Sequence, residues 1–185
     1  MLVEKAYNRA RALEYAQKWA LSRNPLFVDY TGRGGNCTNF VSQCVYAGSC
    51  TMNYTPVFGW YYLTDAQRAP AWTGVPYFFN FVVQNQGVGP YGVQVGQEEA
   101  EPADVIQLYR ADVGWYHTLL IVGLREEDGV PLVAAQSDDA YNRPLDTYTY
   151  EAARFIHILG VRQSVPDIED CFEGIYNAVA IIPNE

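Results

Sequence analysis

The sequence predicts an α+β fold, in which N-terminal helices pack on an antiparallel β-sheet. In the first half of the chain, apolar side chains recur at helical spacing, whereas the second half consists of short apolar runs separated by turn residues. Helices followed by consecutive strands are typical of this class. The 185 residues, 49% of them hydrophobic, suffice for one core. We therefore expect a single domain over residues 1 to 185.

The first predicted helix spans residues 3 to 22. Its apolar positions form one broad face, made of Tyr7, Ala10, Leu13, Tyr15, Ala16 and Trp19. Asn24-Pro25 ends this helix, and a loop rich in glycine leads from Leu26 to Gly35.

The second predicted helix begins at Cys37, with Asn36 as its N-cap and Gly48 as its stop signal. A thiol at the first helical position lies against the positive end of the helix dipole, which favours the nucleophilic thiolate. The alternative is that Cys37 is a small buried hydrophobic residue, which is the commoner role of cysteine when position alone is considered.

The next segments are described by composition more than by periodicity. Residues 50 to 76 are rich in aromatic side chains and predict a loop or short edge strands, whose rings either line a cleft or seal the core. Residues 76 to 86 predict a short helix, and residues 87 to 96 a linkage punctuated by glycine.

The second half predicts a meander of strands, at residues 105–109, 115–124, 130–136 and 153–160, with a polar excursion at 137–150. If residues 125 to 128 form a four-residue hairpin loop, Leu124 pairs with Gly129 and His117 lies opposite Gln136. A five-residue loop would place Ser137 opposite His117 instead. Residues 161 to 185 are expected to form a C-terminal extension, a strand or helix that covers a sheet edge.

Composition excludes several classes of partner. The net charge of −9 opposes binding to nucleic acid and to anionic membrane surfaces. No apolar run approaches the length of a membrane span. Residues 1 to 22 carry charges throughout and contain no signal-peptide core. The compartment stays open, because a cytoplasmic protein and an exported one with a removed leader both fit.

The four cysteines, at positions 37, 44, 50 and 171, form no C-x-x-C pair. Their spacing suits neither a zinc site nor a dense disulfide framework, so we expect no metal and no cofactor. A Cys44–Cys50 disulfide at the end of the second helix and reduced thiols are both compatible with the sequence.

A resemblance to a known family sharpens these predictions. The stretch from Gly34 to Cys44 reads G-G-N-C-T-N-F-V-S-Q-C. Further blocks follow in order at Pro102 to Gln107, Trp115 to Thr118, Ala134 to Asp138 and Arg143 to Leu145. Together they resemble the putative amidase domain family of bacterial proteins, which is similar to the NlpC/P60 and CHAP groups of papain-like cysteine hydrolases. The resemblance implies a papain-like core in which the Cys37 helix packs on the sheet.

The resemblance also implies catalytic roles. Cys37 becomes the nucleophile, and His117 is favoured over His157 as its base, although the residues alone do not separate the two histidines. The third catalytic position, usually histidine in NlpC/P60-like proteins, is Gln136 here. Its carbonyl can accept the imidazole N–H but carries no charge. Asp138 is the substitute orienter.

Tyr30 and Asn36 are the candidates that would bind the oxyanion beside the Cys37 N–H. The alternative for Tyr30 is a ring packed under the loop.

The function that follows is a cysteine-dependent amidohydrolase that cleaves an amide bond through a thioester. The family suggests a small peptide or amide substrate, with a cell-wall peptide of peptidoglycan or an N-acyl amide as examples. One alternative is acyl transfer to an acceptor other than water on the same fold. Another is a non-catalytic binding module or pseudoenzyme. Gln136 favours that last alternative, whereas Cys37 together with His117 favours the two enzymes.

Overall fold

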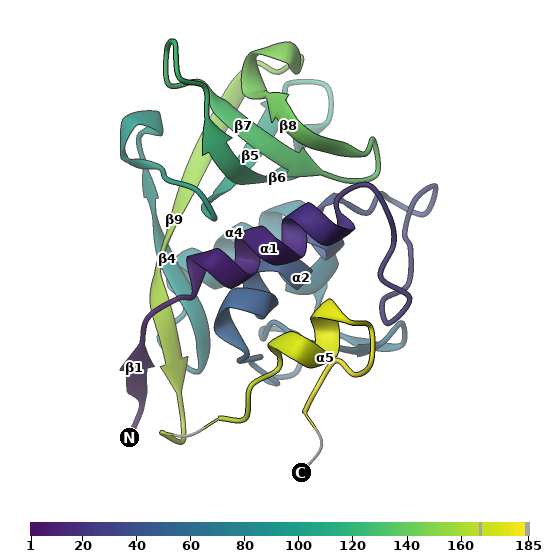
Figure 1. Cartoon of the computed structure of the whole chain (residues 1–185), viewed down its shortest axis with the longest axis vertical. Helices are drawn as coiled ribbons and strands as arrows, with labels where there is room; N and C mark the ends of the chain where they lie inside the picture. Colours follow the sequence, from purple (N-terminus) through teal and green to yellow (C-terminus); the bar gives the residue numbers. More distant parts are fainter. Residues whose placement is uncertain (167, 184–185) are drawn as a thin grey trace.

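The computed structural model describes residues 1–166 and 168–183, and it has the mixed helix and antiparallel-sheet architecture that the sequence predicts (Figure 1). Its α-helices are α1 (Arg9–Trp19), α2 (Cys37–Ser49), α3 (Pro70–Thr73), α4 (Val75–Gln84) and α5 (Phe172–Tyr176). Its strands are β1 (Val3–Lys5), β2 (Tyr62–Thr64), β3 (Gln67–Arg68), β4 (Gly89–Val95), β5 (Val105–Arg110), β6 (Gly114–Leu124), β7 (Pro131–Ala135), β8 (Ala140–Pro144) and β9 (Ala152–Gln163). Two 3₁₀ turns complete them, η1 (Gln97–Glu99) and η2 (Leu145–Thr147).

One seven-stranded sheet forms the frame, with strand order β1-β9-β5-β6-β7-β8 and β4 also paired with β9. Strand β9 pairs with β5 near its start, with β4 along most of its length and with β1 at its end. Figure 1 shows β9 running the length of the molecule, with α1, α2 and α4 against the sheet. Strands β2 and β3 form a separate hairpin.

Side chains alternate between the two faces of the sheet, so each strand contributes to two hydrophobic clusters. Val105 and Leu120 belong to the larger cluster, which the sheet shares with the helices. Ile106 and Leu119 belong to a smaller cluster that contains no α-helical residue. Helix α2 is buried at every position. Its first residue, Cys37, is therefore held by packing all around the helix.

The aromatic segment at residues 50 to 76 folds as the β2–β3 hairpin and α3 with connecting loops. Trp60 and Trp72 are fully buried, with ring centroids 4.7 Å apart. These two rings seal the core. Phe58, in contrast, is 83% exposed.

The first predicted helix is shorter than expected. Helix α1 begins at Arg9, where Asn8 caps it by accepting a hydrogen bond from the Arg11 N–H at 3.1 Å. The preceding residues pair with β9 as strand β1.

The prediction of a linkage at residues 87 to 96 is wrong, because β4 occupies most of it and pairs with β9. Gly92 lies at a register shift in this pair. A Cβ atom at Gly92 would collide with the carbonyl oxygen of His157. That glycine therefore permits close approach of two strands, and it does not mark a loop.

The hairpin between β6 and β7 also differs from the predicted register. Leu124 pairs with Pro131, and the Arg125 N–H donates to the Val130 carbonyl at 2.8 Å, so the predicted pair with Gly129 does not form. The register then shifts between Ile121 and Gly123, so that Leu120 pairs with Ala134. The ladder ends at this pair and β7 ends at Ala135, so among the described strand pairs neither Gln136 nor Ser137 lies opposite His117.

Residues 137 to 150 contain β8, which pairs with β7, and η2. The polar excursion predicted there is thus partly an edge strand. Its burial alternates weakly, which is why the sequence pattern did not reveal it.

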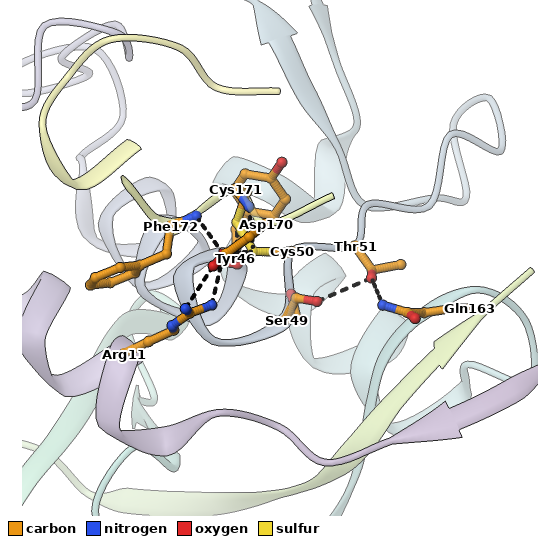
Figure 2. Close-up of a disulfide and its surroundings, with 9 residues drawn as sticks. All are labelled: Arg11, Tyr46, Ser49, Cys50, Thr51, Gln163, Asp170, Cys171 and Phe172. Atoms are coloured by element: carbon orange, nitrogen blue, oxygen red, sulfur yellow. Dashed lines mark hydrogen bonds and ion pairs between the residues drawn. A yellow bond between two sulfur atoms is a disulfide. The ribbon is translucent and has the colours of Figure 1, made fainter. Parts of the chain in front are cut away.

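The predicted C-terminal extension begins with the last three residues of β9, which pair with β1, and its later part packs on helices. Helix α5 contacts α1 and α2. A disulfide joins Cys50, just after α2, to Cys171, just before α5 (Figure 2). The Cys44–Cys50 bridge considered from the sequence is wrong, since Cys44 is a free buried thiol inside α2. Of the predicted extension, residues 167, 184 and 185 lie outside the described residues.

Beside the disulfide, Arg11 on α1 forms two hydrogen bonds with Asp170, at 2.7 and 2.6 Å (Figure 2). The Asp170 carboxylate also accepts the Phe172 N–H at 3.0 Å and so fixes the entry to α5. Within the described part of the chain, no helix is long and apolar enough to cross a membrane.

Candidate active site

The Cys37 sulfur lies where α2 begins, against strand β6. Its contact with the Thr38 hydroxyl measures 3.8 Å, and the backbone N–H groups of Thr118, Thr38 and Cys37 lie near enough to favour the thiolate. The hydroxyls of Thr38 and Thr118 are 2.8 Å apart, which ties the first turn of α2 to β6. The N–H of Thr118 belongs to the peptide bond that joins it to His117. The structure therefore brings the sulfur close to the peptide that follows His117, whereas the described residues show no hydrogen bond between the sulfur and the imidazole.

The ionisation of Cys37 differs from the sequence-based expectation. Burial raises the pKa of the Cys37 thiol above its ordinary value, although the surrounding backbone N–H groups act in the opposite direction. Cys37 is only 8% exposed. The helix N-terminus thus favours the thiolate as predicted, but the loss of hydration outweighs it, and the resting group is a neutral thiol.

His117 is the second half of the predicted pair. Its ring lies between two tyrosines, with centroids 6.0 Å from Tyr116 and 5.7 Å from Tyr148. The pKa of His117 is lowered to about 4, mainly by burial and also by the nearby charge of Arg143, while Asp138 acts in the opposite direction. At neutral pH the imidazole is therefore uncharged and able to accept a proton.

Asp138 acts on His117 through charge and not through a hydrogen bond. Its side chain is 89% exposed and pairs with Arg143 at 3.4 Å. The Arg143 guanidinium lies 3.8 Å from the centroid of the Tyr148 ring, which in turn packs on His117. No hydrogen bond joins Asp138 to His117 in the part of the chain that the structure describes.

Gln136 is not brought to His117, contrary to the predicted hydrogen bond. Its Nε2 donates to the carbonyls of Trp19 and Ser22 at 2.8 Å each, just past the end of α1. Its Oε1 accepts from Asn36 Nδ2 at 2.6 Å. The physical reason is the register described above, which turns Gln136 toward α1. Its place in the structure is that of a buried link between α1 and the loop before Cys37.

Asn36 holds that loop in place. Its Oδ1 accepts the Tyr30 N–H at 3.0 Å and Asn39 Nδ2 at 2.9 Å. Its own N–H donates to Ser137 Oγ at 2.7 Å. Asn36 is the N-cap residue of α2, as predicted, but its side chain makes no capping hydrogen bond. The polar atoms of Asn36 all have partners within the protein, so the residue holds the loop before Cys37 in place. The predicted role of its amide in binding the oxyanion stays a prediction.

Tyr30 is buried, and its hydroxyl donates to Asp65 Oδ1 at 2.8 Å. Burial and this carboxylate raise the pKa of the Tyr30 phenol. The structure thus places the ring under the loop, which is the alternative considered from the sequence, and directs the hydroxyl to Asp65.

A family model described as a putative amidase domain matches residues 6–159, a range that contains Cys37 and His117. The chain belongs to the putative amidase domain family. The Bacillus subtilis (strain 168) protein named Uncharacterized protein YhbB is 33% identical over 141 residues, or 74% of this chain. The match covers 43% of that relative, so the chain spans less than half its length. No solved structure matches the chain.

The other histidine of this amidase domain, His157, belongs to a separate buried cluster. Its Nδ1 lies 2.7 Å from Asp104 Oδ2, and Asp104 also pairs with Arg9 at 2.8 Å. Asp104 Oδ1 accepts the Ile158 N–H at 3.0 Å, while Arg9 donates to the Ile158 carbonyl at 2.8 Å. Asp104 and Arg9 thus form hydrogen bonds with the backbone of Ile158, at the part of β9 that lies between its pairs with β5 and with β1. This arrangement explains Asp104 and His157 as structural residues.

Three polar residues of the amidase domain escaped the sequence analysis. Gln107 pairs across the sheet with Thr118 on one side and with Arg154 on the other. All three side chains are buried, and each has apolar buried residues close to it along its strand. Such polar positions among apolar ones are the one sequence signal that would have singled them out.

Potential metal ligands meet at one place among residues 1–166 and 168–183, at Cys50, Asp170 and Cys171. Two of these three are joined in the disulfide and are unavailable as thiolates.

Proposed function

We propose that the chain is a cysteine-dependent amidohydrolase with Cys37 as nucleophile and His117 as general base. One observation carries the proposal: the Cys37 sulfur lies at the start of α2, close enough to the N–H of the peptide bond that follows His117 for that group to lower the pKa of the thiol. The family membership, through its amidase name, supports amide hydrolysis at a coarse level.

The pair works from a neutral resting state. With the pKa of Cys37 raised and that of His117 lowered to about 4, thiol and imidazole are both uncharged at pH 7. As the sulfur attacks the carbonyl carbon of the amide, His117 takes the thiol proton. A new C–S bond forms, and the carbonyl π electrons move onto oxygen.

Backbone groups at the helix start stabilise the charge on that oxygen. In the first turn of α2, the hydrogen bonds along the helix begin with the Phe40 N–H, which donates to Asn36. The N–H of Cys37 is thus available to the oxyanion. One such donor contributes about 3 kcal/mol in enzymes that have been tested.

Collapse of the tetrahedral intermediate breaks the C–N bond, and the imidazolium of His117 protonates the leaving amine. Water then attacks the thioester while His117 takes one of its protons. The second intermediate releases a carboxylic acid and returns the proton to the Cys37 sulfur. The balanced result is hydrolysis of one amide to an acid and an amine.

For the substrate we propose a small peptide or N-acyl amide, with cell-wall peptides as the first class to test. The papain-like relation of the core remains part of this proposal. It is supported by a cysteine at a helix start that packs on a strand carrying the histidine.

The test is release of amine from a panel of N-acetylated peptides and cell-wall peptides, with mass spectrometry of trapped acyl groups. We expect a thioester on Cys37 and complete loss of amine release in Cys37→Ala. Cys44→Ala is the matched control, because Cys44 is a buried thiol in the same helix and should leave turnover intact. Amine release that persists in Cys37→Ala refutes the proposal. Products formed on added amines and not on water would indicate acyl transfer.

A further inference from the structure

The arginines of this chain are paired with acids in all cases but one. Of ten arginines, nine have a carboxylate oxygen within 4.0 Å. The exception is Arg154 on β9, which has no carboxylate partner in residues 1–166 and 168–183. Arg154 is also among the buried residues, at 9% exposure. In a chain of net charge −9, the lack of an acid there is a specific feature of this position.

The surroundings of Arg154 stabilise its charge without neutralising it. The guanidinium carbon lies 3.5 Å from the centroid of the Phe79 ring and 4.0 Å from that of Trp115. Its Nε and Nη2 both donate to Gln107 Oε1, at 2.9 and 2.6 Å. Rings and an amide are neutral partners, so a positive charge remains for an anion to bind.

One edge of the guanidinium is open. In the described part of the chain, Nη1 makes no hydrogen bond, and it does not belong to the fully buried atoms without partners. The flanking rings of Phe79 and Trp115 are themselves only partly buried. An incoming carboxylate can therefore reach Nη1 from solvent without displacing the Gln107 contacts.

Arg154 lies in one row with the proposed nucleophile. Thr118, Gln107 and Arg154 are cross-strand neighbours on β6, β5 and β9, so the outer two lie about 10 Å apart along the sheet. Gln107 spans the middle of the row, donating to Thr118 Oγ1 at 3.3 Å. The Thr118 hydroxyl in turn lies 2.8 Å from that of Thr38, the residue next to Cys37. The Arg154 guanidinium reaches from β9 to Gln107 on β5. It therefore lies one strand away from Thr118 on β6, the strand against which Cys37 packs.

We propose that Arg154 binds a carboxylate of the amide substrate and so selects peptides or N-acyl amino acids that carry a free carboxylate near the scissile bond. This inference rests on the proposed function, because it takes the amide carbonyl to lie at Cys37. The planar guanidinium suits a carboxylate, and most of its surface is already removed from water in the folded protein. Arg154 is a residue that determines specificity.

The experiment compares two probes that differ only at the carboxylate, N-acetyl-alanyl-alanine and its C-terminal amide. Binding is measured by calorimetry on the full chain with Cys37→Ala, which prevents turnover. We expect the acid to bind at least about tenfold more tightly than the amide, as for a charge-assisted pair. Adding Arg154→Met, which keeps a long side chain between the rings, should reduce that ratio to about one. Arg154→Lys, which keeps the charge but loses the fork, should give an intermediate ratio.

Equal binding of the acid and the amide to the Cys37→Ala protein, or no binding of either, overturns the inference. So does a preference for the acid that survives Arg154→Met. If Arg154→Met fails to fold, the inference is still tested by comparing the binding of the two probes to the Cys37→Ala protein. The proposed function fails on a different observation, namely amine release that continues without Cys37, so the two failures are distinguishable.

Discussion

Two groups of buried polar side chains are attached to the same strand of the sheet, β5, and they are built differently. Asp104, just before β5, forms the closed cluster with Arg9 and His157. Gln107, within β5, forms the open row with Thr118 and Arg154. The closed cluster contains both signs of charge, whereas the open row contains only a cation.

This difference distinguishes polar residues that stabilise the fold from polar residues that are available to bind a ligand. In the closed cluster, the fully buried Asp104 finds its cation and its backbone donor inside the chain. The backbone hydrogen bond and the ion pair that Asp104 makes are enough to account for its burial. In the open row the guanidinium has no counter-charge among the described residues, and the row ends at Thr118, beside the start of the Cys37 helix. The two histidines follow the same division, since His157 has a carboxylate at 2.7 Å and His117 has aromatic neighbours.

The largest expected effect is on the closed cluster. Asp104→Ala removes the buried carboxylate that pairs with Arg9 and leaves the Ile158 N–H without its acceptor, so we expect a loss of about 4 kcal/mol in the free energy of unfolding. Urea unfolding measures this value. Asp112→Asn, which breaks an exposed ion pair with Arg110, is the control and should leave the unfolding midpoint unchanged. A loss no larger than that of the control contradicts the structural role of Asp104.

A smaller effect concerns His117 and pH. Its pKa is lowered to about 4 in the folded protein, against about 6.5 when unfolded. The unfolded chain therefore binds a proton first as pH falls, so this contribution is complete above pH 6.5 and is lost toward pH 4. We expect the loss to amount to roughly 2 kcal/mol for this partly buried group.

His117→Gln should remove that pH dependence, so the stability difference between the two proteins changes between pH 6.5 and 4. Urea unfolding at several pH values measures it, and a constant difference across that range refutes the lowered pKa. In the wild type, amide hydrolysis should persist well below pH 6.5, because the base stays neutral there.

A third effect tests how the open row is joined to Cys37. Thr118→Val removes the hydroxyl that lies 2.8 Å from Thr38 Oγ1 and 3.3 Å from Gln107 Nε2. We expect a loss of about 1 kcal/mol in stability, because buried polar atoms lose a partner. Thr118→Ser keeps the hydroxyl and is the matched control. Turnover per folded molecule should change little in both, since the backbone N–H to the sulfur remains; a collapse of turnover in the valine variant alone would show that the hydroxyl takes part.

Much of the fold could be predicted because local patterns determined it. Helix α2 begins at Cys37 as its cap and periodicity indicate, and β9 fills the last predicted strand. Strand β4 was missed because its glycines resemble loop punctuation, whereas Gly92 is required by the close approach of β9. The Cys50–Cys171 pairing joins residues 121 positions apart, a separation that no local pattern reports.

The site was predictable in its chemistry and less so in its contacts. Cys37 and the peptide after His117 meet in space, whereas the partner of Gln136 depended on a register that shifts within β6. One displaced pair in a hairpin is enough to turn a side chain from the imidazole to the end of α1. The raised pKa of Cys37 likewise follows from burial, which the helix-dipole argument omits.

The smallest expected effect completes the comparison. Arg154→Met removes a buried charge that has no counter-ion among the described residues. The variant no longer bears the free-energy cost of burying that charge, and this gain offsets the lost hydrogen bonds with Gln107. The free energy of unfolding should therefore change by less than about 1 kcal/mol. Arg9→Met, in the closed cluster, leaves Asp104 buried without its cation and should cost several times more in the same urea titration. If the two methionine variants lose equal stability, the unpaired guanidinium is as structural as the paired one, and the division between a closed cluster and an open row fails. A small loss in Arg154→Met means that the protein keeps an unneutralised guanidinium beside Cys37 without needing it to fold.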